Sequence, residues 1–178
     1  MTVGRALDMT SGLADAAPTL WLMGNSSSTF MDRHALRDFV TSIDALNYPV
    51  GTEVSYTNSG YRMVQAALEA KGVDYAAALR ETFFRPLGLT MHLPEDEAEP
   101  VANLATGYWK SAQGWRRGRY GLHFSASGGI TGTARDLATW CHALLAGRGP
   151  AAGLLRTLSA KRALVDGTPT GYGLGLAR

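Results

Sequence analysis

The residue types that most often bind metals or carry out catalysis are few in this chain, and their spacing matches no common motif. The sequence holds four histidines and one cysteine, namely His34, His92, His123, His142 and Cys141. None is spaced as a metal ligand pair, and one thiol cannot build a structural zinc site. Phosphate-binding loops, dinucleotide fingerprints, H-E-x-x-H and G-x-S-x-G are all absent from the sequence. We therefore expect no metal and no other cofactor.

Four segments, in order along residues 2–145, carry the strongest signal. They read TVGRALDMTSGL (2–13), PVGTEVSYTNSGY (49–61), FFRPLGL (83–89) and SASGGITGTARDLATW (125–140). Together they resemble the serine β-lactamase and penicillin-binding-protein-like superfamily, in particular its class C, esterase and D-aminopeptidase branch. One segment alone would be a weak signal, whereas four in the right order make the resemblance strong. Met9 stands where that family often has histidine, and Asp8 and Trp140 also depart from its usual residues.

The resemblance implies roles for Tyr56 and Asn58, which fall on the family's Tyr-x-Asn element. It implies that the Tyr56 phenol acts as the general base, or relays to it, and that the Asn58 amide holds a catalytic lysine and the substrate. A phenol with a reference pKa near ~10 becomes a useful base only beside cations that stabilise the phenolate. An amide donates and accepts hydrogen bonds at once. The alternative is that Tyr56 is a packed aromatic and Asn58 a plain helix cap.

Two other elements of the family are missing from the sequence. Its nucleophile lies in S-x-x-K, and the nearest match here pairs Ser159 with Arg162, whose guanidinium stays protonated. In the family S-x-x-K precedes the segment that begins here at residue 2, and K-T-G or H-x-G follows a stretch like YGLGL at 172–176. We therefore expect residues 1–178 to form a single incomplete domain, a fragment lacking both ends.

Periodicity and capping residues predict the elements that position Tyr56 and Asn58. The first half should contain a helix in TVGRALDM, an irregular surface segment over 11–31, a helix from Asp32 to about Leu46, and a helix that Asn58 or Ser59 caps and Gly72 follows. The second half should contain a helix from Asp74 to Phe83, long loops over 90–128 with short strand-like pieces, a helix between Thr133 and Gly147, a helix over Ala151–Leu164, and a strand entry in GYGLGLA.

The resemblance also implies the fold. Proteins of that family have a two-part α/β fold. One part is an antiparallel sheet flanked by terminal helices, and the other is an all-helical region inserted into it. This chain matches the helical region, so we expect a mainly α structure with a few short strands and an incomplete sheet.

The composition is typical of one folded domain, and its nearly balanced charge does not indicate a charged partner. The 178 residues are 46% hydrophobic, with 17 basic and 15 acidic side chains. WRRGRY at 115–120 is better explained as a solvated loop than as a nucleic-acid patch, because three cations make few phosphate contacts. No apolar run approaches the ~20 residues of a membrane span, and the first residues do not resemble a signal peptide. As written the chain would be cytoplasmic, and its localisation stays unknown because an export signal would lie upstream.

The leading hypothesis is a β-lactamase-related serine hydrolase that cleaves an amide or ester through an acyl-enzyme in the full-length parent. The chain alone should be inactive. The competing hypothesis is an inactive truncated product or a non-enzymatic binding or interaction module. The sequence leaves open whether the substrate is a β-lactam, a D-amino-acid peptide or an ester. Helix faces that would pack on a missing sheet should favour self-association.

Overall fold

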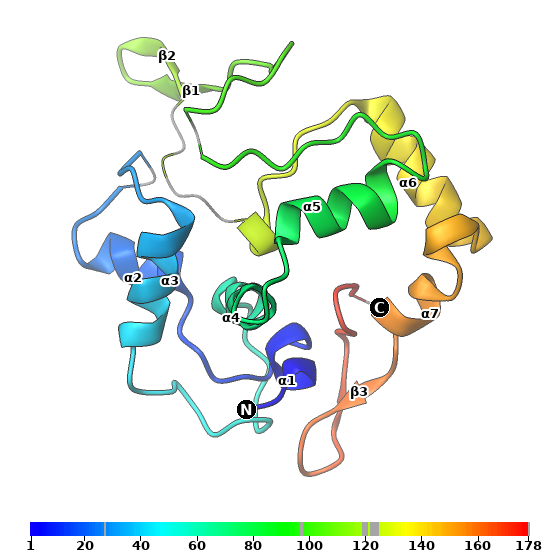
Figure 1. The fold of residues 1–178 in the computed structure, drawn as a ribbon. Coiled ribbons are helices and arrows are strands. Elements are labelled where there is room, and N and C mark those ends of the chain that lie inside the picture. Colours follow the sequence, from blue (N-terminus) through cyan, green and yellow to red (C-terminus); the bar gives the residue numbers. More distant parts are fainter. Residues whose placement is uncertain (27, 97, 119–120, 122–124, 178) are drawn as a thin grey trace.

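The computed structural model describes residues 1–26, 28–96, 98–118, 121 and 125–177 and is mainly helical, as predicted (Figure 1). Its α-helices are α1 (Val3–Leu7), α2 (Ala16–Leu22), α3 (Arg33–Ser42), α4 (Ser59–Glu69), α5 (Tyr75–Leu79), α6 (Ala134–Ala146) and α7 (Leu154–Leu158). A π-helical turn, η1 (Arg80–Phe84), continues α5, and η2 (Ser125–Ser127) and η3 (Gly149–Ala151) are single 3₁₀ turns.

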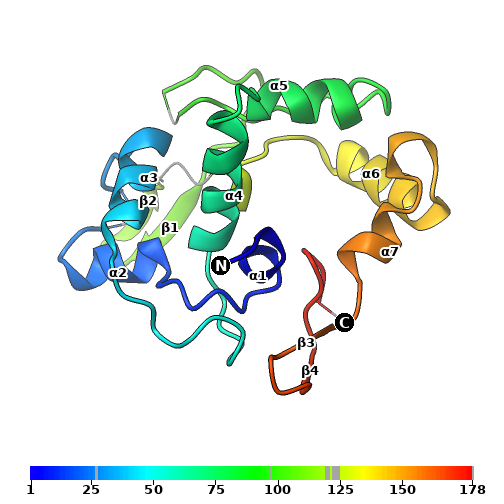
Figure 2. The ribbon, with the colours of Figure 1, turned by 60° about the horizontal axis from the view of Figure 1, so that its bottom comes forward.

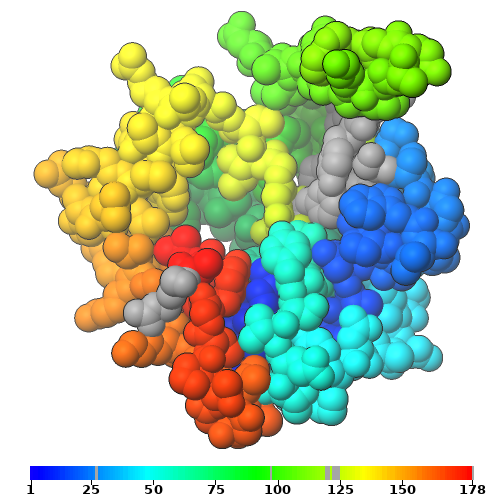
Figure 3. Space-filling model, turned by 180° about the vertical axis from the view of Figure 1, so that it is seen from behind, coloured from blue at the N-terminus to red at the C-terminus, as the bar shows by residue number. Residues whose placement is uncertain are grey.

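The strands in the described residues form two small antiparallel pairs. A hairpin joins β1 (Tyr108–Ser111) to β2 (Gly114–Arg117), and β3 (Arg162–Ala163) pairs with β4 (Pro169–Thr170). The β1–β2 hairpin stands out from the body as a lobe, seen in yellow-green at the upper edge of Figure 3. The predicted strand entry in GYGLGLA forms only an isolated bridge between Tyr172 and Ala177.

Most helix starts lie where the capping residues predict them. Side chains of Thr2, Asp32 and Asp74 each accept a hydrogen bond from a first-turn backbone N–H. Thr133 and Asp136 form a capping box at the predicted start of α6, and Gly147 ends that helix in the left-handed conformation. The helix after Asp32 is shorter than predicted, because the backbone becomes extended at Ile43.

Two predictions were wrong. Residues 11–31 are not an irregular surface segment, since α2 lies within them and its Ala16, Ala17 and Leu20 join Leu36 and Val40 in the buried cluster. The buried face of α2 consists of two alanines and a leucine, so its apolar pattern in the sequence is weak.

The helix predicted over Ala151–Leu164 is also wrong. Only Leu154–Leu158 is α-helical, since Gly153 adopts the left-handed conformation before it and the chain turns into β3 after it. The predicted span therefore holds the last residue of the 3₁₀ turn η3, the short helix α7 and the strand β3.

Helix α4 runs through the middle of the molecule, between the α2–α3 pair and α1 (Figures 1 and 2). Gly60 at its start lies against the Ala6 carbonyl of α1, where a Cβ would collide with the backbone. Helices α6 and α7 form a second group beyond α5 and η1. No helix in the described ranges is both long enough and apolar enough to span a membrane.

Candidate functional site

Tyr56 and Asn58 lie on the loop that leads into α4, and their side chains meet. The Tyr56 hydroxyl donates a hydrogen bond to Asn58 Oδ1 at 3.2 Å. Tyr56 is 65% exposed, so its ring is not packed into the core. Asn58 occupies the N-cap position of α4, but its side chain makes no capping hydrogen bond. Neither the Tyr56 hydroxyl nor the Asn58 amide is therefore used to cap α4.

The Asn58 amide is held from the other side by Asp15. Asn58 Nδ2 donates to Asp15 Oδ2 at 2.9 Å, while Asp15 Oδ1 caps α2 at the Ala17 N–H. Ser59 strengthens the same junction, because its hydroxyl donates to the Ala14 carbonyl at 2.7 Å. The Asp15 contact fixes which end of the Asn58 amide faces Tyr56. Asp15 is not among the residues predicted from the sequence, although an aspartate before an alanine-rich turn is a readable helix-cap signal.

A cavity of about 180 Å³ opens beside these two side chains. Its walls come from segments far apart in the sequence, and its lining residues are Met9, Tyr56, Asn58, Tyr61, Ala126, Ser127, Tyr172 and Gly175. Three of the four family-like segments, together with the YGLGL stretch, therefore meet at one place. This convergence is the kind expected of a binding site.

The Tyr61 phenol has a different environment from that of Tyr56. It is half-buried and donates to the Leu7 carbonyl at 2.9 Å. Burial raises the pKa of Tyr61, and the neighbouring Tyr172 and Tyr56 phenols raise it further. Tyr61 therefore stays protonated and acts as a fixed hydrogen-bond donor between α4 and α1.

Met9 and Asp8, two departures from the family pattern, have structural roles here. Met9 is buried, and its sulfur accepts a hydrogen bond from the Thr57 N–H at 3.4 Å. Asp8 is fully buried and accepts from Arg162 Nε at 2.8 Å, with Arg5 at 3.7 Å. Arg162, which stands third after Ser159 at the position of the family's lysine, thus ties β3 to the end of α1.

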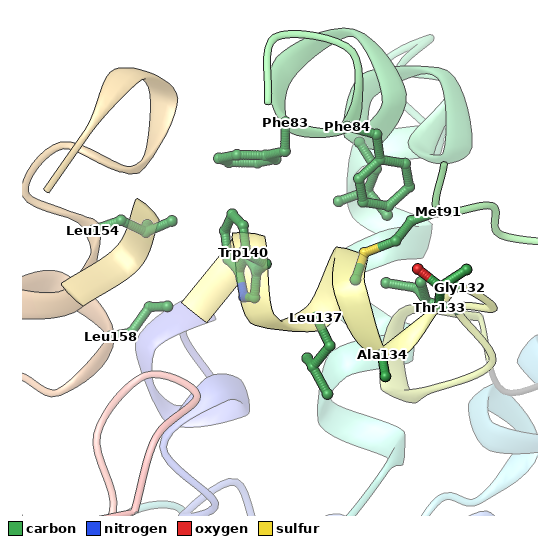
Figure 4. A pocket seen from close by; sticks show the side chains of 12 residues that line it. Phe83, Phe84, Met91, Gly132, Thr133, Ala134, Leu137, Trp140, Leu154 and Leu158 are labelled. Atoms are coloured by element: carbon green, nitrogen blue, oxygen red, sulfur yellow. The ribbon is translucent and has the colours of Figure 1, made fainter. Parts of the chain in front are cut away.

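A larger cavity of about 640 Å³ lies elsewhere, between η1, α6 and α7 (Figure 4). Its walls are almost entirely apolar, and Phe83 and Trp140 meet edge to face with ring centroids 5.6 Å apart. No set of polar side chains from the described residues points into it, so it offers no hydrogen-bonding groups like those that line the cavity beside Tyr56. Among the described residues, no cluster of histidine, cysteine and carboxylate side chains is placed to hold a metal ion.

Comparisons with known proteins agree on one family. The Beta-lactamase family model matches residues 1–178. A D-aminopeptidase of Cereibacter sphaeroides is 29% identical over 99% of this chain and 34% of its own length, and one of Gluconobacter oxydans is 25% identical over 94% of this chain and 32% of its own. The chain thus spans about a third of these relatives.

Solved structures share the fold. The D-amino acid amidase from Ochrobactrum anthropi SV3, complexed with L-phenylalanine amide, superposes with a TM-score of 0.73 at 24% identity, over 99% of this chain and 53% of that one. A penicillin binding protein from Bacillus halodurans gives a TM-score of 0.74 at 19% identity, over 96% of this chain and 54% of that one. The chain therefore shares its fold with these two proteins.

Proposed function

Because this chain belongs to the Beta-lactamase family along its whole length, we propose that it supplies the Tyr-x-Asn element of a serine hydrolase acting on amides of amino acids. The observation that carries the proposal is the hydrogen-bonded pair of Tyr56 and Asn58 at the mouth of a cavity. An exposed phenol and an oriented amide at one opening supply a proton acceptor and a substrate-orienting group together.

Tyr56 has the role of general base in this proposal. When a serine Oγ attacks the substrate carbonyl, its proton passes to the phenolate, directly or through a lysine amine. The leaving amine then takes that proton as the carbon–nitrogen bond breaks, and water hydrolyses the acyl-enzyme. Within the described part of the chain, no lysine or arginine hydrogen-bonds to Tyr56. The cation that stabilises its phenolate would therefore come from the S-x-x-K element.

Asn58 has the role of orienting that cation. Its Nδ2 is engaged by Asp15 and its Oδ1 faces Tyr56, so one lone pair of Oδ1 can accept from an ammonium group. A lysine bound there would lie next to the phenol, where its charge favours the phenolate. The Asp15 contact supports this role because it prevents the amide from turning its NH₂ group toward the lysine.

The nucleophile is the part that these 178 residues do not supply. No serine in the sequence is followed at the third position by lysine. Ser59 is fully buried and bonded to the Ala14 carbonyl and the Ala16 N–H, so it is no substitute. We infer that the chain alone does not form an acyl-enzyme.

The substrate we propose is an amino acid amide, of D configuration. The curated relatives are named D-aminopeptidases. One structural neighbour is named a D-amino acid amidase and was solved with the amide of L-phenylalanine, so the amide comes from both comparisons and the D configuration from the names of the proteins. Of the three substrate classes that the sequence leaves open, we therefore favour D-amino-acid compounds with an amide bond over β-lactams and esters.

The test begins with the reading frame on either side of the chain and continues with hydrolysis of D-phenylalanine amide by the protein it encodes. We expect an S-x-x-K upstream and an active protein in which Tyr56→Phe lowers kcat by about 100-fold. Tyr108→Phe, which removes the hydroxyl of a similarly exposed tyrosine that does not line the cavity, is the matched control. Full activity of Tyr56→Phe would rule out its role as base.

The lack of an S-x-x-K serine favours a second candidate, a non-enzymatic binding or interaction module. A reading frame without this element would support the module. The chain itself can be incubated with a fluorophosphonate and weighed intact. We expect no adduct, and an adduct on any serine would contradict the inference that the nucleophile lies elsewhere.

A further inference from the structure

The β1–β2 hairpin exposes an unusual set of side chains. Tyr108, Trp109 and Trp115 are each more than half exposed, and Trp115 reaches 71%. Large aromatic side chains normally lose most of their surface to packing, so three on one short hairpin point to a partner. The lobe formed by the hairpin projects from the body in two views (Figures 1 and 3), which leaves it accessible.

The strand register distributes aromatic and basic side chains over both faces of the hairpin. Trp109 lies opposite Arg116, and Lys110 lies opposite Trp115. Because neighbouring residues of a strand point to opposite faces, the first pair occupies one face and the second pair the other. Each face therefore combines an indole with a cation.

The positive charge of the hairpin is not neutralised within the described structure. Lys110, Arg116 and Arg117 form no ion pair with any described residue, and the sequence holds no carboxylate from 101 to 135. In the acidic segment before the hairpin, Glu95 binds Arg33 at 2.9 Å and Glu99 binds His92 at 2.6 Å, while Asp96 accepts from the Ala98 and Glu99 N–H groups. The hairpin thus keeps three cations for an external anion.

We propose that the β1–β2 hairpin docks on an anionic phospholipid surface. Indole and phenol rings favour the interfacial layer of a bilayer, and each nearby lysine or arginine adds attraction to anionic headgroups. A medium that surrounds the hairpin can bury Trp109 and Trp115 together, although they lie on opposite faces. A nucleic acid strand stacks on the aromatics of one face, so it would cover Tyr108 and Trp115 and leave Trp109 exposed on the other. The register therefore favours the lipid.

The test is sedimentation of the full chain with vesicles of phosphatidylcholine, with and without phosphatidylglycerol. We expect binding to the anionic vesicles only, and weaker binding as salt is raised. The triple variant Lys110→Glu, Arg116→Glu, Arg117→Glu should lower the partition coefficient on the order of 100-fold. Separately, Trp109→Ala with Trp115→Ala should lower it about tenfold.

The matched control reverses the same charge at three exposed cations outside the hairpin, Lys71→Glu, Arg148→Glu and Arg156→Glu. This variant should bind several-fold more weakly at most. Equal loss in the control, equal binding to neutral vesicles, or displacement of bound chain by a single-stranded oligonucleotide would each overturn the proposal. Circular dichroism of the variants establishes that they remain folded.

Discussion

Asp15 joins the start of α2 to the loop before α4, because its carboxylate accepts from both the Ala17 N–H and Asn58 Nδ2. The second bond, at 2.9 Å, sets the amide of Asn58 so that Oδ1 faces the Tyr56 hydroxyl. One side chain thus serves as a helix cap and as a positioning group. The two roles can be separated experimentally.

Replacing Asp15 with alanine should lower stability and disturb the site together. Loss of the cap costs about 1 kcal/mol, and the freed Asn58 amide can rotate away from Tyr56. Asp74→Ala is the matched control, since Asp74 caps α5 at the Ala77 N–H without touching the site. Urea unfolding should show similar losses for both variants.

Only the rate of hydrolysis, and not the stability, should distinguish the Asp15 variant from the Asp74 variant. In the protein that hydrolyses D-phenylalanine amide, Asp15→Ala should lower kcat about tenfold while Asp74→Ala leaves it unchanged. Asp15→Asn, which keeps an acceptor oxygen, should recover part of the loss. Equal kcat for the two alanine variants would show that Asp15 is a cap alone.

The ion pair between Asp8 and Arg162 makes a second prediction. Asp8 is fully buried, so removing its closest cation leaves a carboxylate whose remaining partners are Arg5 and Thr10. Arg162→Ala should therefore cost about 2 kcal/mol of unfolding free energy. Arg156→Ala, at an exposed position on α7, should change stability by no more than about 0.5 kcal/mol. Similar urea midpoints for the two variants would contradict this role of Arg162.

Asp136 makes the stability depend on pH. Its carboxylate accepts hydrogen bonds from the backbone N–H and the hydroxyl of both Thr90 and Thr133. These bonds lower the pKa of Asp136 in the folded state. The folded state then binds fewer protons than the unfolded state, so the stabilisation is fully present above about pH 4 and is lost as pH falls below it.

The measurement is urea unfolding at pH 7 and at pH 3 for the native chain and for Asp136→Asn. The variant should be less stable at pH 7, because an amide cannot accept all four bonds. It should also lose less stability than the native chain on going to pH 3. Parallel losses in the two proteins would show that Asp136 does not control this dependence.

The helix starts were predictable because capping is local. Asp32, Asp74 and Thr133 each satisfy backbone groups within three residues, so their roles can be recognised in a short stretch of sequence. The closeness of Tyr56 and Asn58 is also local, since they are only two residues apart in the sequence.

The long-range contacts were not predictable. Asp15 and Asn58 are 43 residues apart, and Asp8 and Arg162 are 154 apart, so no local pattern links them. The short helix α2 was missed because its buried face is made of alanines with a single leucine. Alanines carry little apolar surface, so such a face gives a weak periodic signal in the sequence even though it is buried in the structure.

The apolar cavity beside α6 makes the last prediction. Leu137 lines this cavity and remains 56% exposed, whereas Leu145, on the same helix and 74% exposed, does not line it. We expect the isolated chain to self-associate through this face, because contact between copies would remove the apolar lining from water. Leu137→Glu should reduce association in sedimentation velocity, since burying the new carboxylate at that contact is costly. Leu145→Glu adds the same charge outside the cavity and should leave association unchanged. Equal effects of the two substitutions would mean that net charge, and not this face, governs association.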